Sequence, residues 1–166
     1  AFRNYEIGCD LLYNLPYREL LDIFARINTY TVKLNPQELL NAKYVGYFKQ
    51  FAYEAGYRYV DYFIEARVLT KAQVLRMAEA SLTSDLLVAL VDGVQTNKIV
   101  ESFYRKYEDD AGDADGALER FDETMTFLSG AYPASELANT NWSRIHLFYS
   151  LFCAMAHGRF GLDGLN

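Results

Sequence analysis

Residues 39–67 form the longest stretch of helical periodicity in the chain, and their apolar side chains fall on two faces instead of one. At about 100° per residue, one narrow sector holds Tyr44, Phe48, Phe51, Ala55, Tyr59, Tyr62 and Ala66. A second stripe on the opposite side holds Tyr53, Tyr57, Val60 and Ile64. Because periodic aromatic residues usually pack inside a protein, the segment predicts a helix that is central to a bundle or shared with a partner. A bend is expected at Gly46 or Gly56.

Helix-start signals precede two segments of the chain. Asn35 is placed as an N-cap, Pro36 at the first helical position and Glu38 where a capping box puts its acid. Thr70 is the expected N-cap of the next helix. We expect a break at residues 82–85 before the apolar run 86–91, which Asp92-Gly93 closes.

The remaining segments extend this helical series. Further helices are predicted at 97–107, 114–128 and 141–157, with a short turn at 135–138. Near the start, Pro16 fits the first turn of a helix that stops near Asn28, and residues 5–13 read as one strand or as the lead-in to that helix. The predicted fold is therefore an all-α helical bundle with at most one short N-terminal strand.

Composition limits the setting of the chain. Its 166 residues, 51% of them hydrophobic, suffice for a compact core. No apolar run is long enough for a membrane helix, and the two cysteines do not form a disulfide framework, so we expect a soluble, cytoplasmic protein. The start at Ala1, without an initiator Met, suggests a piece of something longer.

Charge is concentrated in one part of the sequence. The net charge is -6, and residues 108–123 hold eight acidic residues and one arginine. Lysines and arginines form no cluster elsewhere. The chain thus lacks the basic surface that nucleic-acid binding requires.

Two polar clusters contain residue types that bind metals but lack the spacing of a metal site. With Gly116 at the sixth position of a calcium loop, Ala111 occupies the first position and Asp122 the twelfth, so two defining ligands are missing. His146 and His157 share one helix face with Cys153 but lie about 16 Å apart along the axis, too far to hold one metal ion. We therefore predict no metal site and no catalytic residue in this chain.

The segment 23–42 is the most distinctive part of the sequence. It reads Ile-Phe-x-Arg-Ile-Asn-Thr, then Leu-Asn-x-x-Glu-Leu-x-Asn-Ala. This pattern resembles a conserved block in a large family of domains of unknown function, which supplies the N-terminal, ParB-like part of GmrSD modification-dependent restriction endonucleases. Residues 5–7 resemble the strand before that block, and the later segments resemble the helical region of some members. Thr31 and Leu40 depart from the family pattern, which commonly has Gly and Arg there.

The resemblance implies a nucleotide-sensing or nucleotide-hydrolysing domain used in restriction or phage defence. The family's Asp-Gly-Gln-Gln-Arg motif precedes the block and does not occur in this sequence. Residues 1–34 then correspond to the end of a ParB-like domain, and residues 35–166 to a helical domain. No cofactor is expected in this fragment, whereas the intact protein would use a nucleoside triphosphate with Mg. The implied partners are the upstream ParB-like domain, a nuclease domain or DNA reached through the intact protein, and a second copy of the chain.

Arg26 and Asn28 are the candidate site residues within this block. An arginine near a helix end followed by an asparagine at the break can hold a nucleotide or phosphate, with Asn35 and Glu38 in supporting roles. The structural alternative is that Arg26 pairs with Asp22 or Glu38 while Asn28 caps the helix end.

Two other functions compete with this reading. The chain can be a non-catalytic helical interaction module that mediates self-association or partner binding through residues 44–62. The third option is a single-strand nucleic-acid binder that stacks bases on the same aromatic stripe.

Overall fold

The computed structural model describes residues 33–94 and 99–164, together with residues 9, 11, 13–16, 19, 20 and 23. The chain divides into two compact units, Ala1–Leu34 and Asn35–Asn166. In the first unit, the N–H groups of Glu19 and Leu20 donate to the carbonyl of Pro16 at 2.9 and 3.2 Å, which forms a helical turn at that proline. Most of the strand expected within 5–13 lies outside the described residues, as does most of the helix expected after Pro16. The ParB-like identity of residues 1–34 stays a prediction.

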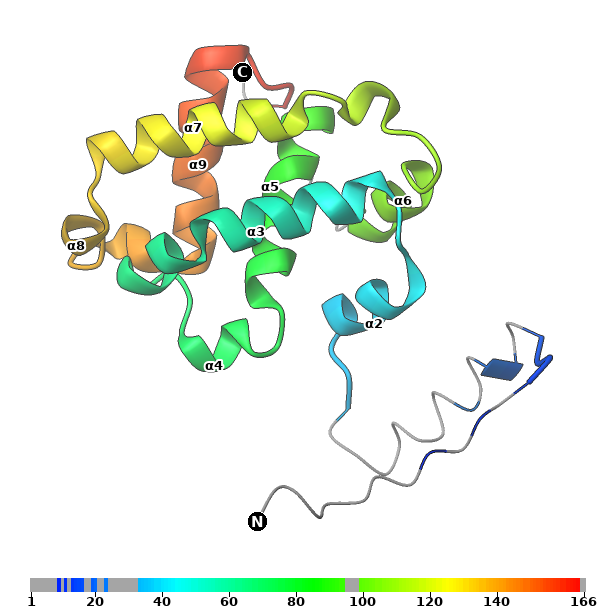
Figure 1. Cartoon of the computed structure of the whole chain (residues 1–166). Helices are drawn as coiled ribbons and strands as arrows, with labels where there is room; N and C mark the ends of the chain where they lie inside the picture. Colours follow the sequence, from blue (N-terminus) through cyan, green and yellow to red (C-terminus); the bar gives the residue numbers. More distant parts are fainter. Residues whose placement is uncertain are drawn as a thin grey trace, which may run out of the picture. The chain divides into compact units, whose positions relative to one another are not determined.

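The second unit is all-α, which confirms the predicted fold class (Figure 1). Its helices are α2 (Pro36–Lys43), α3 (Tyr47–Glu65), α4 (Lys71–Val74), α5 (Ala78–Asp92), α6 (Val100–Lys106), α7 (Ala117–Ala131), α8 (Ala134–Leu137) and α9 (Ile145–Phe160). Two 3-10 turns join them, η2 (Gly112–Ala114) and η3 (Asn141–Ser143). None of the helices in the described part of the chain is both long and apolar enough to cross a lipid bilayer.

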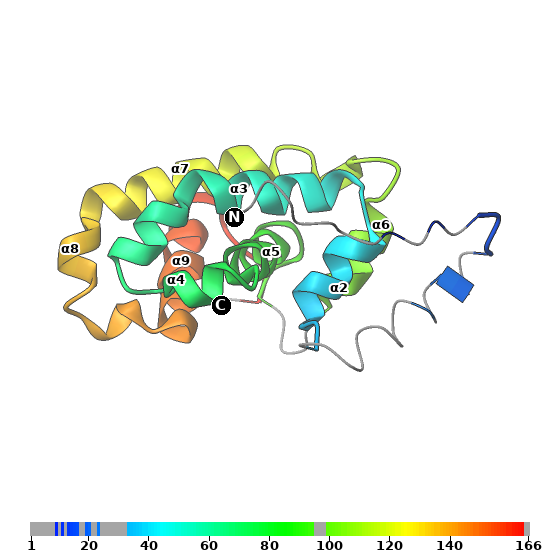
Figure 2. The ribbon, with the colours of Figure 1, turned by 60° about the horizontal axis from the view of Figure 1, so that its bottom comes forward.

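Helix α5 occupies the centre of this unit. It packs against α3 on one side and against α7 and α9 on others, and Figures 1 and 2 show these helices surrounding it. Its own side chains explain this position, because Leu86, Leu87 and Ala89 are fully buried. The nearly continuous apolar run 86–91 is what a helix covered on several sides requires.

The core between these helices is rich in aromatic side chains. Phe63 of α3 meets Phe148 of α9 edge to face, with ring centroids 5.6 Å apart. Phe121 of α7 lies 5.3 Å from Phe152 of α9. Such pairs add roughly 0.5–1.5 kcal/mol each to the free energy gained from burial alone.

The two stripes of α3 have different environments. In the first stripe Phe48, Ala55 and Ala66 are fully buried, and Tyr44 nearly so, which confirms that this stripe faces the core. In the second stripe Tyr57 is 85% exposed. One side of α3 therefore packs in the core, and the opposite side is in solvent at Tyr57.

The long helix predicted for residues 39–67 is divided at residues 44–46, between α2 and α3. Gly46 lies so close to another segment that a Cβ atom there would be 2.3 Å from the Cα of Glu108. The carboxylate of Glu108 accepts the N–H groups of Val45 and Gly46, both at 3.0 Å. Gly56, the other expected bend, lies inside a continuous α3.

The break predicted at residues 82–85 is wrong, because α5 runs through them without interruption. The hydroxyl groups of Thr83 and Ser84 are buried and donate to backbone carbonyls, Thr83 to Ala52 at 2.7 Å and Ser84 to Ala80 at 2.7 Å. The polar side chains are thus satisfied within the helix packing. The actual break lies at residues 75–77, where Met77 adopts a left-handed conformation with φ 61°.

Most other element boundaries follow the sequence signals. The capping boxes at Asn35 and Thr70 are both formed, and α5 ends at Asp92 with Gly93 as its C-cap. Helices α6, α7, α8 and α9 fall in the predicted segments, with ends shifted by a few residues.

Candidate functional site

The two supporting residues predicted from the sequence, Asn35 and Glu38, meet at the start of α2. The Asn35 side chain accepts the N–H of Glu38 at 2.9 Å, and the Asn35 N–H donates to the Glu38 carboxylate at 2.7 Å. The same carboxylate receives Arg76 Nε at 2.6 Å and Arg76 Nη2 at 2.8 Å. The Asn35 amide also donates to the carbonyl of Arg76 at 2.7 Å. We call Asn35, Glu38 and Arg76 the α2 clasp.

The α2 clasp ties the first residue of the second unit to the turn between α4 and α5. A bidentate arginine–carboxylate pair fixes the direction as well as the distance between its partners. The hydrogen bond from Arg76 lowers the pKa of the Glu38 carboxyl, with a further contribution from the Asn35 N–H. Arg26 and Asn28, the predicted nucleotide- or phosphate-contacting residues, lie outside the described residues, so this assignment stays a prediction.

A buried hydrogen-bond chain lies behind the α2 clasp. Gln37 donates through its Nε2 to the hydroxyl of Tyr104 at 2.8 Å. The Tyr104 hydroxyl lies 3.0 Å from the Ser84 oxygen, which in turn donates to the carbonyl of Ala80. Because the Ser84 hydroxyl proton is donated to Ala80, the Tyr104 hydroxyl is the donor in its hydrogen bond with Ser84. Each of these buried polar side chains is therefore engaged within the protein.

Glu79 of α5 carries one of two buried side-chain oxygen atoms that lack a hydrogen-bond partner among the described residues, the other being Asp122 Oδ1. The Glu79 atom concerned is Oε2, which is shielded from solvent. Burial raises the pKa of this carboxyl. Its Cγ lies 3.2 Å from where a Cβ of Gly56 would stand, so the small residue at position 56 makes room for it.

The acidic segment uses its side chains to hold its own loop. Asp113 accepts from the Tyr107 hydroxyl at 2.6 Å and from Lys106 Nζ at 3.0 Å, and Asp110 accepts the N–H of Gly112 at 3.1 Å. The hydrogen bonds from Tyr107 and Lys106 lower the pKa of the Asp113 carboxyl. Within the described ranges no three His, Cys, Asp or Glu side chains gather as potential metal ligands.

The polar stripe on α9 is also structural in its contacts. Cys153 is buried, which raises the pKa of its thiol to about 11. His157 lies with Nδ1 3.0 Å from the carbonyl of Leu162, at the end of the helix. The Cys153 thiol therefore lacks the environment of a nucleophile at neutral pH.

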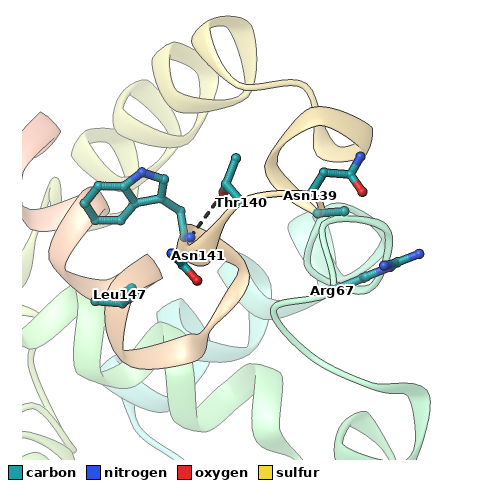
Figure 3. Close-up of a pocket in the computed structure, with 7 residues that line it drawn as sticks. Arg67, Asn139, Thr140, Asn141 and Leu147 are labelled. Carbon is teal, nitrogen blue, oxygen red and sulfur yellow. Dashed lines mark hydrogen bonds between the residues drawn. The ribbon is translucent and has the colours of Figure 1, made fainter.

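A groove of about 730 Å³ opens where the end of α3 meets the connection between α8 and α9 (Figure 3). It is lined by Arg67, Ala138, Asn139, Thr140, Asn141, Trp142 and Leu147. In the view of Figure 3, Arg67 and Asn139 lie on one side and Leu147 on the other, with Thr140 and Asn141 between them. We call this the Arg67 groove.

The backbone that presents Arg67 has an unusual conformation for an arginine. Arg67 has φ 59°, in the left-handed region, and closes a Schellman motif in which Val68 N–H donates to Phe63 O at 2.9 Å and Arg67 N–H to Ile64 O at 3.0 Å. Glycine is the usual residue at this position, since other residues pay a steric cost there. Arg67 thus lines the edge of the groove with an exposed cation, and in the view of Figure 3 its side chain extends away from Asn141 and Leu147.

The sequence analysis did not select the residues of the Arg67 groove. They come from two segments more than seventy residues apart, and their proximity depends on the packing of α3 against α8 and of α8 against η3. One local signal was present, the run Asn139-Thr140-Asn141-Trp142, which is polar and aromatic and lies between two predicted helices.

Comparisons of the chain with protein-family models, with curated proteins and with solved structures find no significant match.

Proposed function

We propose that residues 35–166 form the helical support of a cytoplasmic, ParB-like, GmrSD-related restriction or phage-defence protein. In this proposal Arg26 and Asn28 contact a nucleotide or its phosphate, and the main nucleotide motif lies upstream of the chain. A nucleoside triphosphate with Mg is the ligand of the intact protein. No described residue is assigned to the nucleotide or the metal.

The α2 clasp is the observation that supports this proposal. Asn35 and Glu38 lie within the segment 23–42 that resembles the family block, and both are fixed by Arg76. Because Arg76 is itself followed by the buried helix α5, the start of the helical unit is anchored to its core. Such an anchor is what a supporting domain offers to a binding site carried by the preceding segment.

The test measures nucleoside triphosphate hydrolysis by the complete encoded protein in the presence of Mg. We expect Arg26→Ala to lower turnover at least tenfold at unchanged melting temperature, since it removes a phosphate contact. Arg105→Ala is the matched control, because Arg105 is exposed on α6 and makes only a long 3.8 Å pair with Glu101. Normal turnover by Arg26→Ala, or a complete protein that hydrolyses no nucleotide, would contradict the proposal.

Self-association is the second candidate function, and the exposure of Tyr57 favours it. The first aromatic stripe packs in the core of the protein. The outer face of α3 is therefore the side of this helix that can contact a second copy. Size-exclusion chromatography with light scattering measures the molar mass in solution and so distinguishes a dimer from a monomer. A concentration-dependent dimer that Tyr57→Ser weakens supports this candidate, and a monomer at all concentrations removes it.

A further inference from the structure

We propose that the Arg67 groove binds an extended peptide segment that carries a carboxylate. This inference is independent of the nucleotide proposal, since it concerns different residues. The ligand class follows from the charge, the hydrogen-bonding groups and the apolar surface that the groove presents.

The seven lining residues of the groove include one positively charged side chain and no negatively charged one. Arg67 is its only charged lining residue, is exposed, and has no side-chain partner in the described part of the chain. The segment 137–162, which supplies the rest of the groove, contains no Asp or Glu, although the chain as a whole is acidic. An approaching carboxylate therefore meets a guanidinium that need not give up another partner.

The amide side chains of the groove match a peptide backbone. Asn139 uses its Nδ2 to donate to the carbonyl of Ser135 at 2.9 Å, which leaves its Oδ1 available to accept a peptide N–H. The side chain of Asn141 is exposed and makes no hydrogen bond within the described structure, so it offers both a donor and an acceptor. One amide can pair with both polar groups of a peptide unit.

The turn that carries these amides is held rigidly from below. Thr140 Oγ1 donates to the carbonyl of Leu137 at 2.8 Å and accepts the N–H of Trp142 at 3.1 Å, the contact drawn in Figure 3. Ser143 Oγ donates to the carbonyl of Thr140 at 2.8 Å. A site fixed in this way loses little conformational entropy when a ligand binds.

Apolar contact comes from Trp142 and Leu147. Trp142 is 38% exposed, and Leu147 is partly buried beside it in the lining. A volume of about 730 Å³ lies in the range of small-molecule sites and fits a few residues of extended chain. The groove thus offers one cationic, two amide and two apolar contacts along its length.

A phosphate ligand fits this groove less well than a carboxylate. Phosphate carries close to two negative charges, and proteins that recognise it through side chains commonly use clusters of arginines. The groove supplies a single guanidinium, which balances one carboxylate. The carboxylate has two possible sources, an Asp or Glu side chain or the C-terminus of the peptide.

The binding experiment uses Trp142 as the reporter, because it is the only tryptophan in the chain. Its fluorescence is followed on addition of three peptides of otherwise equal sequence: amidated with an internal Glu, neutral with a free C-terminus, and neutral with an amidated C-terminus. We expect a Kd on the order of 10⁻⁴ M for at least one acidic peptide and at least tenfold weaker binding of the fully neutral one. The better acidic peptide identifies the source of the carboxylate.

Substitution of Arg67 separates the charge from the fold. Arg67→Gln is expected to weaken the acidic peptide at least tenfold while leaving the melting temperature unchanged. Asn141→Ala should weaken acidic and neutral peptides by equal factors, since it removes a backbone contact. Arg105→Gln, an exposed cation on α6, is the control and should bind as the wild type does.

Several outcomes would overturn the inference. These are equal binding of the neutral and acidic peptides, wild-type affinity in Arg67→Gln, no change in Trp142 fluorescence with any peptide at about 10 mM, and tighter binding of inorganic phosphate or adenosine monophosphate than of the acidic peptides. The last result would assign the groove to a phosphate ligand instead.

Discussion

The two ends of α3 are built on opposite principles. At its N-terminal end the residue type suits the backbone, because the close approach of Glu108 leaves no room for a Cβ atom at Gly46. At its C-terminal end the residue departs from the geometry, since Arg67 stands in a left-handed position that favours glycine. The first end is closed by the carboxylate of Glu108, whereas the second borders an open groove.

The polar side chains near the two ends of α3 also differ. Those near one end are hydrogen-bonded within the fold, and those near the other are available to a ligand. Near the N-terminal half of α3, Gln37, Tyr104 and Ser84 bond to one another in the interior. Near the C-terminal end, Arg67 and Asn141 have no side-chain partner among the described residues. A steric cost accepted at an exposed cation points to a use for its side chain. Four predictions test the contrast.

Gly46→Ala is expected to have the largest effect. A Cβ atom 2.3 Å from backbone atoms of Glu108 forces α3 and the segment after α6 apart, with a loss of about 3 kcal/mol in the free energy of unfolding. Urea denaturation measures the change. Gly130→Ala is the control, because nothing lies within 4 Å of that Cβ position on α7, and it should leave stability equal or slightly higher.

Tyr104→Phe tests the buried chain behind the α2 clasp. The substitution keeps the ring but removes the hydroxyl that Gln37 donates to, so a buried amide loses its acceptor. We expect a loss of about 2 kcal/mol, measured by the same denaturation experiment. Tyr57→Phe serves as the control on the same scaffold, since Tyr57 is 85% exposed. A neutral Tyr104→Phe would show that this polar chain is dispensable for the fold.

The α2 clasp should make stability depend on pH. Arg76 lowers the pKa of Glu38, so the stabilisation is complete above the ordinary carboxyl value of 4.5 and is lost as pH falls from there through the lowered pKa. Glu38→Gln is expected to reduce the fall in melting temperature between about pH 7 and pH 3. Glu119→Gln, exposed on α7, should keep the wild-type slope. An unchanged slope in Glu38→Gln would remove the proposed ionic role of the clasp.

Arg67→Gly should have the smallest effect on stability and the opposite sign. Relief of the left-handed backbone is expected to raise the free energy of unfolding by about 0.5–1 kcal/mol, while binding of the acidic peptide falls at least tenfold. Met77→Gly is the control, since Met77 has the same backbone conformation at φ 61° and does not line the groove. This substitution also removes the sulfur that accepts the Tyr53 hydroxyl at 3.4 Å, so its gain in stability should be smaller, and peptide binding should be unchanged. A destabilised Arg67→Gly would mean that the arginine side chain serves the fold.

Local signals carried the successful sequence predictions. The capping boxes at Asn35 and Thr70 need only residues three positions apart, and the stripe containing Phe48 and Ala55 needs only helical periodicity. The predicted break at residues 82–85 failed because Thr83 finds its acceptor at Ala52 on another helix, which no local pattern shows. The Arg67 groove was missed for the same reason.

The close contact between Gly46 and Glu108 also has a consequence for the order of folding. The first turn of α3 receives its capping acceptor from a residue 62 positions later in the chain. Until α6 has docked, the first turn of α3 lacks the Glu108 carboxylate. The start of α3 is therefore completed late, by a contact between residues far apart in the chain. A ribosome-bound chain that has not yet exposed Glu108 therefore carries α3 with a frayed beginning, and the unit gains cooperativity because neither partner is complete alone.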